Sequence, residues 1–183
     1  MPVKPNFNPD FLYFVTTNAV SHFHLFQHDS AKRGIVDSFH FLRASGRMNL
    51  YVFVVMPNHI HFIARFSADY TLSDMMRDFK RHTARQIIRE LQAKGNEKPL
   101  SLLRQANTDA RQEYKVWEDN YDGRDVFSSE FLQQKMDYIH WNPCQPQWKL
   151  AENPEEYLWS SARFYIVDQP AIIPVDDVRE LFF

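Results

Sequence analysis

The chain has 183 residues, a net charge of −2 at pH 7, 44% hydrophobic residues and 15% aromatic residues. This composition supplies enough apolar surface for a core, which excludes a disordered chain, and the length fits one domain. No apolar run reaches the length of a membrane span, the start lacks the apolar core of a signal peptide, and the lone Cys144 cannot close an internal disulfide. We therefore expect a cytoplasmic protein without a membrane partner, with one domain over residues 1–167 and an acidic tail over 168–183.

The first half of the chain predicts a strand, a helix, two strands and a long helix. Residues 11–17 are aromatic and β-branched, as is typical of a strand, and apolar residues recur at helical spacing over 30–45. Two apolar runs, 50–56 and 59–66, are joined by Pro57-Asn58, which indicates a tight turn between antiparallel strands. Residues 71–94 form the longest helical pattern, and Gly95 is a natural end for that helix.

The second half predicts shorter elements. Polar residues 96–112 predict a loop, 114–117 a short strand and 121–124 a turn. A helix is expected over 128–141, because the following Asn142-Pro143 disfavours helical backbone, and a final short helix over 154–165. The order β-α-β-β-α-β-α predicts an α+β fold of the ferredoxin-like (RRM-like) kind, an antiparallel sheet with helices on one face.

Two histidines in the second strand of the predicted hairpin are candidate metal ligands. His59 and His61 flank Ile60, and because side chains of a strand alternate between faces, both imidazoles point to the same side. Histidine nitrogens suit manganese, iron, nickel or zinc better than calcium. A His-x-His pair also arises by chance as solvated or core residues. A second pair, His22 and His24, has the same spacing, and we interpret it as loop packing.

Tyr138 lies near the end of the predicted 128–141 helix and is a candidate nucleophile. Asn142 comes one helical turn later, so both side chains share a helix face and can reach one site. An amide oxygen is a hard ligand that can bind a cation beside two histidines. A phenol, with a reference pKa of roughly 10, needs a metal or a base before it attacks. Simple packing of the tyrosine ring remains the competing interpretation.

Charge is distributed unevenly along the chain. Residues 71–94 carry six basic against three acidic residues, whereas residues 168–183 carry four acidic residues against one basic residue. A basic helix can meet the phosphates of a nucleic acid, or it can simply be a solvated face. The candidate DNA-binding residues of this helix are Arg77, Lys80, Arg81, Arg85 and Arg89.

Three segments resemble, in order and spacing, the motifs of the HUH single-tyrosine transposases. Residues 55–62 read VMPNHIHF and resemble the MPNHxH signature, in which two histidines flank a hydrophobic residue. Residues 138–143 read YIHWNP and resemble the Y-I-x-x-N-P nucleophile helix. Residues 156–161 read EYLWSS and are similar to a Trp-Ser-Ser element of the REP-associated tyrosine transposases. The resemblance covers roughly residues 11–165.

The resemblance implies a DNA-cleaving activity. His59, His61 and Asn142 would bind Mg²⁺ or Mn²⁺, and Tyr138 would attack a scissile phosphate in single-stranded or hairpin-forming DNA. The products would be a 5′-phosphotyrosine link and a free 3′-OH, and a second 3′-OH could reseal the strand without ATP. The sequence holds no P-loop, as that scheme requires. The resemblance also implies that the basic helix lies near the site and holds DNA.

Two other functions remain open on the sequence. A nucleic-acid-binding module of the same layout would perform no cleavage, and a metal-dependent phosphodiesterase would use water, leaving Tyr138 a packing role. The family pattern is changed at Trp141, at Cys144 and over residues 145–148, which bears on the DNA that is recognised. A monomer and a homodimer are both compatible with the sequence.

Overall fold

The computed structural model describes residues 7–181. Residues 1–6, for which we expected no signal peptide, and residues 182–183 of the acidic tail lie outside the described range. A four-stranded antiparallel sheet has the order β2-β3-β1-β4. Its strands are β1 (Leu12–Asn18), β2 (Met48–Val55), β3 (His59–Phe66) and β4 (Asp122–Val126). Helix α1 (Asp29–Ala44) connects β1 to β2, and α2 (Leu72–Ala93) follows β3. This α+β arrangement confirms the ferredoxin-like fold.

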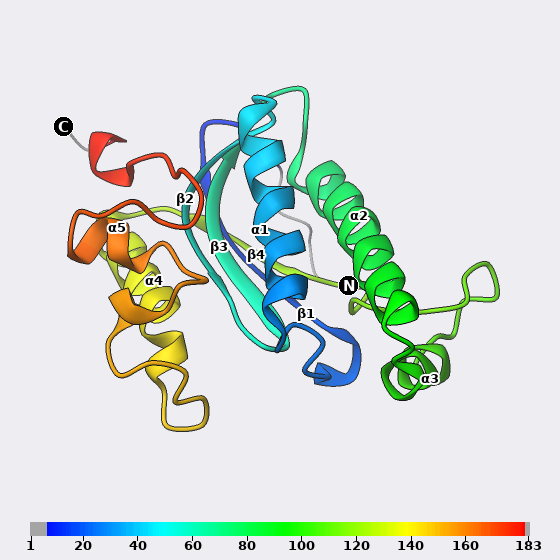
Figure 1. Ribbon diagram of the computed structural model, residues 1–183. Helices are drawn as coiled ribbons and strands as arrows, with labels where there is room; N and C mark the ends of the chain where they lie inside the picture. Colours follow the sequence, from blue (N-terminus) through cyan, green and yellow to red (C-terminus); the bar gives the residue numbers. More distant parts are fainter. Residues whose placement is uncertain (1–6, 182–183) are drawn as a thin grey trace.

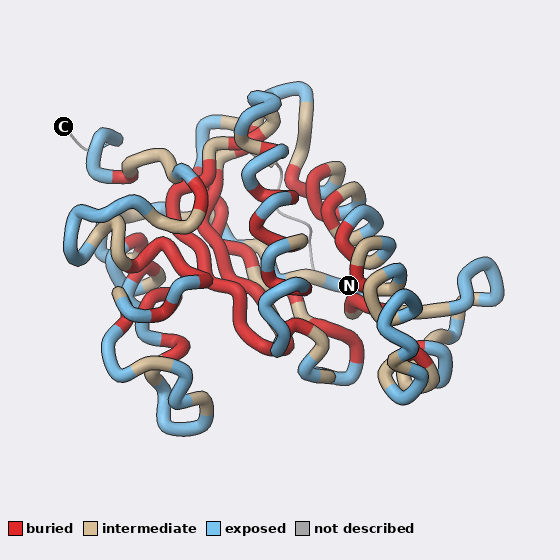
Figure 2. Tube along the Cα trace, in the orientation of Figure 1, coloured by how far each residue is buried: buried red, intermediate tan, exposed pale blue. Residues whose placement is uncertain are grey.

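The sequence predicted helices on one face of the sheet, but helices occupy both faces, because α4 also packs on the strands (Figure 1). On one face, α1 and α2 pack together, and the ring of Phe39 in α1 stacks on Phe79 of α2 and contacts Phe62 of β3. On the other face, α4 (Ser129–Trp141) brings Tyr138 against Phe14 of β1. Figure 2 shows the buried residues gathered along the strands and the inner sides of these helices. The face that α1 and α2 leave uncovered therefore carries α4.

The ends of the helices follow local capping signals. The Thr71 hydroxyl accepts a hydrogen bond of 3.2 Å from the Asp74 amide at the start of α2, and Gly95 follows this helix with a φ of +64°. The Ser128 hydroxyl accepts a 3.1 Å bond from the Phe131 amide at the start of α4. Side-chain caps of this kind satisfy amides that have no partner within the helix. These two predicted helices therefore begin where the sequence indicates.

The polar segment 96–112, expected to be a loop, contains the helix α3 (Glu97–Gln105). Its Leu100 and Leu103 are buried, and this i, i+3 apolar pair is enough to hold a short helix against the domain. The strand predicted over 114–117 forms only an isolated bridge to the residue after β1. The fourth strand therefore comes later in the chain than the sequence predicted.

The turn expected at 121–124 is wrong, because these residues enter β4, which pairs with the edge of β1. The glycine that suggested a turn has another role. A Cβ atom added at Gly123 would lie 3.0 Å from a methyl group of Leu72. The absence of a side chain at Gly123 therefore lets the start of α2 approach the strand closely. The polar composition reflects an exposed edge strand.

The single helix predicted over 154–165 is replaced by two short elements with an extended segment between them. The short elements are the 3-10 turn η3 (Pro154–Glu156) and the helix α5 (Ala162–Ile166). The intervening chain pairs with the edge of β2, where the Val55 amide donates to the Trp159 carbonyl at 2.9 Å and the Ser161 amide donates to the Phe53 carbonyl at 3.0 Å. The Trp-Ser-Ser element therefore covers an edge that would otherwise expose unpaired backbone groups.

Ser161→Ala is expected to destabilise the fold. The buried Ser161 hydroxyl accepts a 2.9 Å bond from the Phe53 amide and lies 3.0 Å from Nε2 of His140. Its loss leaves buried polar groups unpaired, so the free energy of unfolding should fall by about 1–3 kcal/mol. Urea denaturation measures this change, with Ser101→Ala, a partly exposed serine of α3, as the control. Equal, small effects for both substitutions would contradict this reading of the Trp-Ser-Ser element.

The described part of the acidic tail packs on the domain. The Asp176 carboxylate accepts two 2.9 Å bonds from the Arg43 guanidinium and a 2.9 Å bond from the Leu50 amide. This bidentate pair ties the tail to α1 and β2. Among residues 7–181, no helix is long and apolar enough to cross a membrane.

Candidate active site

His59 and His61 lie side by side on the face of the sheet that carries α4. The register pairs His61 with Thr16 and His59 with Asn18 on β1. The two imidazole centroids are 4.7 Å apart, with the ring planes inclined by 74°. Strand alternation therefore produces a pair of imidazoles on one face, as the spacing predicts.

Each imidazole is oriented by a neighbouring side chain. Nδ1 of His59 lies 2.6 Å from the Asn58 amide oxygen, and Nδ1 of His61 lies 2.7 Å from the Thr16 hydroxyl. Because an amide oxygen only accepts, Nδ1 of His59 carries the proton and Nε2 keeps a lone pair. Partners of this kind fix the ring orientation of histidines that bind metals.

Both histidines are held in the neutral form. Burial lowers the pKa of His59 to about 4, with a smaller contribution from the charge of His22. Burial likewise lowers the pKa of His61 to about 3, and the charges of His59 and Lys135 add to this effect. At neutral pH each ring therefore offers an unprotonated nitrogen, the form in which histidine binds a cation.

Tyr138 of α4 stands against this pair. Its ring meets His61 edge-on at 5.0 Å between centroids and meets Phe14 edge-on at 6.2 Å. The tyrosine remains 47% exposed, so a large substrate can reach it. The Lys135 ammonium, three residues earlier on the helix, lies 5.7 Å from the centroid of the Tyr138 ring. A phenol, an ammonium and two neutral imidazoles therefore meet at one partly open surface.

Asn142 extends the face of α4 by one residue. Its backbone angles, φ −55° and ψ −45°, are helical, and it begins the 3-10 turn η2 (Asn142–Cys144). The residue is buried, and its side-chain oxygen has no hydrogen-bond partner among residues 7–181. Nε2 of His61 is also buried without a partner in that range. Each of these two neutral atoms keeps a lone pair without a hydrogen-bond partner, so both are suitable ligands for a divalent cation.

No group of three or more His, Cys, Asp and Glu side chains placed to hold a metal occurs within the described chain. A three-ligand site built on the histidine pair therefore needs a different third donor. The orphaned amide oxygen of Asn142 supplies an atom of the right kind.

The basic helix α2 does not lie beside this site, contrary to what the resemblance implied. It packs on the opposite face of the sheet, where its Phe79 stacks on Phe39 of α1. Lys80 is engaged within the protein, because its ammonium donates to the carbonyls of Glu118 and Asn120 at 2.8 and 3.0 Å. Burial lowers the pKa of Lys80 to about 8.

The other cations of α2 divide into two groups. Arg77 forms ion pairs with Asp74 at 2.8 Å and Asp78 at 3.0 Å. The remaining three are exposed and recur every four residues, which places them in one row along the helix. These residues are Arg81, Arg85 and Arg89.

The second histidine pair, interpreted from the sequence as loop packing, borders the site. It belongs to the chain around the 3-10 turn η1 (Val20–His22). The ring of His24 lies 5.6 Å from that of Trp148, and Trp148 lies 5.7 Å from His59. The loop thus contacts the site through Trp148.

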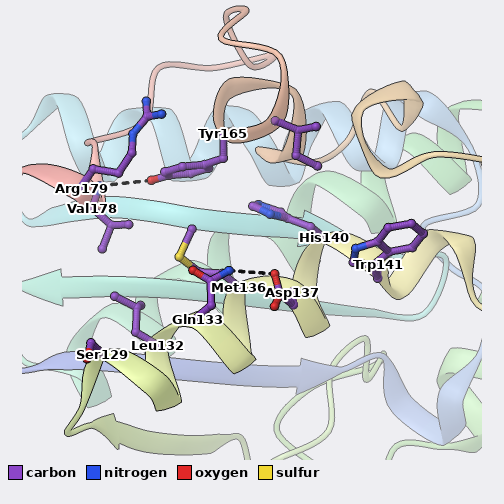
Figure 3. Close-up of a pocket in the computed structure, with 11 residues that line it drawn as sticks. Ser129, Leu132, Gln133, Met136, Asp137, His140, Trp141, Tyr165, Val178 and Arg179 are labelled. Atoms are coloured by element: carbon purple, nitrogen blue, oxygen red, sulfur yellow. Dashed lines mark hydrogen bonds between the residues drawn. The ribbon is translucent and has the colours of Figure 1, made fainter.

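A cavity of about 400 Å³ lies between α4 and the C-terminal segment (Figure 3). Met136 and His140 of α4 face Tyr165 and Arg179 across it. Tyr138 and the histidine pair do not line this cavity. It is therefore separate from the candidate active site.

Comparison with known proteins identifies the family. The family described as "Transposase IS200 like" matches residues 14–142, from β1 to the end of the candidate site. This match covers more than half of the chain, so the protein belongs to the IS200-like transposase family. The family assignment confirms the resemblance drawn from the sequence motifs.

Several solved structures are similar to this chain. One is a REP-associated tyrosine transposase bound to a REP hairpin, with 16% identity, coverage of 97% of this chain and 93% of that chain, and a TM-score of 0.61. It shows that the two proteins share a fold. Another is the structure of a protein from Deinococcus radiodurans R1 that is assigned as a transposase. It has 16% identity, coverage of 76% of this chain and 95% of that chain, and a TM-score of 0.47. A search of curated proteins gave no match.

Proposed function

We propose that this chain cuts and rejoins single-stranded DNA next to a hairpin, with Tyr138 as the nucleophile. One observation carries the proposal: the half-exposed Tyr138 ring lies 5.0 Å from the neutral His61 imidazole. The pair His59 and His61, with centroids 4.7 Å apart, and the buried, unpaired side-chain oxygen of Asn142, one helical turn after Tyr138, are donors of the kind a cation needs. A simple DNA-binding module would need none of these groups in this arrangement.

The proposed cleavage is an in-line displacement at phosphorus. The phenol oxygen of Tyr138 forms a bond to the phosphorus as the bond from phosphorus to the 3′ oxygen breaks. The phenol loses its proton, and the departing 3′ oxygen gains one. The 5′ end stays linked to the protein as a phosphotyrosine, and attack by another 3′-OH reverses the step and frees Tyr138. The energy of the phosphodiester is held in that link, so no ATP is consumed.

His59, His61 and Asn142 would hold Mg²⁺ or Mn²⁺, since their donor atoms are neutral and, for His61 and Asn142, buried without a protein partner. Such a cation polarises a phosphoryl oxygen and neutralises part of the phosphate charge. Lys135 contributes a second positive charge beside the Tyr138 ring, at 5.7 Å. This charge favours an approaching phosphate and a tyrosine oxygen that is losing its proton.

The DNA partner we propose is a hairpin with a single-stranded flank. One structure of the same fold is a transposase bound to a REP hairpin. The exposed arginine row of α2 offers this chain a surface for a phosphate backbone on the face opposite Tyr138. Tyr138 and His61 meet within one chain, so cleavage can take place in a monomer.

The arginine row should control the salt dependence of DNA binding. Replacing Arg81, Arg85 and Arg89 with glutamine should weaken binding to all hairpin sequences. The slope of log affinity against log salt should become shallower by about one unit for each phosphate that the protein no longer neutralises. Fluorescence anisotropy across a salt series measures both quantities. Lys98→Gln on α3 is the control. An unchanged slope in the triple variant would show that the arginine row is a solvated face that does not contact DNA.

The proposed activity is tested with protein, Mn²⁺ and a pool of labelled hairpin oligonucleotides with single-stranded flanks. A denaturing gel should show shortened DNA together with labelled DNA that migrates with the protein. Shortened DNA without any protein-linked label would instead favour a phosphodiesterase that uses water. DNA that is bound and never cut would favour a binding module.

A further inference from the structure

A second cavity, of about 600 Å³, is lined by Trp148, whose ring lies beside His59. This volume lies within the roughly 300–1,000 Å³ typical of small-ligand sites. Five segments enclose the cavity: the loop after β1, the start of α1, the turn between β2 and β3, the turn after η2, and the chain that covers the edge of β2. The cavity is thus built where several loops meet beside the site.

Trp148 joins the cavity to the candidate active site. It lines the cavity, and its ring lies 5.7 Å from the His59 ring. Pro57, two residues before His59, also lines it. A ligand in the cavity would therefore lie one aromatic ring away from a proposed cation ligand.

The lining combines flat aromatic rings with directional polar groups. The half-buried Trp148 supplies the stacking ring, the buried Trp159 forms part of the wall, and Gln27 and Gln147 supply amides that can both donate and accept. The Asp29 carboxylate, whose side chain is 79% exposed, adds an acceptor at the rim. Stacking surfaces beside groups that read hydrogen-bonding edges are the chemistry that recognises an unpaired nucleobase.

The Asp29 carboxylate is held in place by two residues of the lining. Its Oδ1 atom accepts a 3.2 Å bond from the Trp159 indole and lies 3.4 Å from the Lys32 ammonium. The side chain of Lys32 is only 8% exposed, and its ammonium also donates to the Gln27 carbonyl at 3.0 Å. The polar rim is therefore organised before any ligand binds, which favours selective recognition.

Positive charge flanks the cavity. The exposed Arg33 guanidinium lies 5.2 Å from the centroid of the Trp159 ring. Lys149, also exposed, follows Trp148 directly in the chain. A base that enters the cavity brings its phosphates with it, and these two cations match that charge.

We propose that this cavity binds one unpaired nucleobase of the DNA strand, close to the phosphate attacked by Tyr138, with Trp148 as the stacking surface. This inference rests on the proposed function, because the DNA strand must already lie at the histidine pair. It gives a role to residues 145–148, which depart from the family pattern. The base in the cavity contributes to the choice of cleavage site.

The test uses DNA hairpins with random single-stranded flanks in EDTA, so that binding is measured without cleavage. One abasic nucleotide is placed at each flank position in turn. Removal of the base at a single position should weaken binding about tenfold, within the range for loss of one stacked base. Trp148→Ala should weaken binding to the intact flank by a similar factor and add little further loss at that position. Trp148→Phe should keep most of the affinity.

The control is Phe41→Ala, which removes an exposed ring of α1 outside this cavity and should leave binding unchanged. Thermal unfolding of each variant separates a weakened DNA interaction from an unfolded protein. The abasic series on the wild-type protein needs no variant, and a flat series overturns the proposal. The proposal is also overturned if Trp148→Ala and the abasic nucleotide weaken binding independently at every flank position, so that their effects are fully additive. If either result were found and the Tyr138–DNA adduct still formed, the proposed function would hold and only the base-binding cavity would be wrong. A protein that neither binds nor cuts DNA would contradict the proposed function and the cavity together.

Discussion

Tyr138→Phe should lose strand cleavage and the covalent protein–DNA adduct together. The substitution removes one oxygen and keeps the ring that contacts His61 and Phe14. Because no other group then forms the bond to phosphorus, the cleavage rate should fall by more than about a thousandfold, as expected when a nucleophile is removed. Labelled hairpin oligonucleotides, Mn²⁺ and a denaturing gel measure the rate and the adduct in one experiment.

The fold should tolerate this change, because Tyr138 is 47% exposed. The free energy of unfolding should stay within about 0.5 kcal/mol of the wild-type value, as is usual for surface substitutions. Tyr114→Phe is the matched control, since the Tyr114 hydroxyl accepts a bond from Arg104 outside the site. Cleavage by Tyr138→Phe at the wild-type rate would instead show that water is the nucleophile.

The double substitution of His59 and His61 by alanine should abolish cleavage in Mg²⁺ and in Mn²⁺. It removes two neutral nitrogens of the proposed cation site, whose imidazole centroids are 4.7 Å apart. Without the cation the phosphate loses its positioning and the neutralisation of its charge, so activity should fall to background. Titration calorimetry with Mn²⁺ should show the same loss as a binding isotherm that disappears.

Hairpin binding in EDTA should survive in this double variant, because the arginine row lies on the opposite face of the sheet. His82→Ala, an exposed histidine of α2, is the control and should keep both metal binding and cleavage. Metal-dependent cutting at the wild-type rate by the double variant would contradict the ligand assignment.

The parts of the site that follow local periodicity could be predicted from the sequence. His59 and His61 share a face because a strand alternates its side chains, and Tyr138 and Asn142 share one because four residues complete a helical turn. The two halves meet because α4 packs on the sheet, and no local pattern encodes that contact. The resemblance to a family supplied that link, and the contact between Tyr138 and His61 is consistent with it.

The residues that the sequence did not single out act through contacts between distant segments. Thr16 reaches His61 through the register of β1 and β3, which depends on the pairing of the whole sheet. Lys80 looked like a free cation of a basic helix, yet three carbonyls of a later loop accept its bonds. Lys135 was detectable in principle, since it lies three residues before Tyr138 on the same helix.

Glycine and polar residues misled the prediction of the fourth strand. Gly123 suggested a turn, but it lies in β4 where the Leu72 side chain comes close. An edge strand needs no alternation of apolar residues, because much of it faces solvent. Its position is decided by the free edge of β1, which is a property of the assembled sheet.

The most direct test of the account is to locate the nucleotide on the protein. After cleavage of the DNA, the adduct is digested with nuclease and trypsin and analysed by mass spectrometry. Trypsin cuts after Lys135 and Lys149, which yields a peptide whose single tyrosine is Tyr138. We predict that this peptide carries the mass of a 5′-linked nucleotide, with fragment ions that place it on Tyr138. Cleaved DNA together with only the unmodified peptide, or a nucleotide on another residue, would contradict the account.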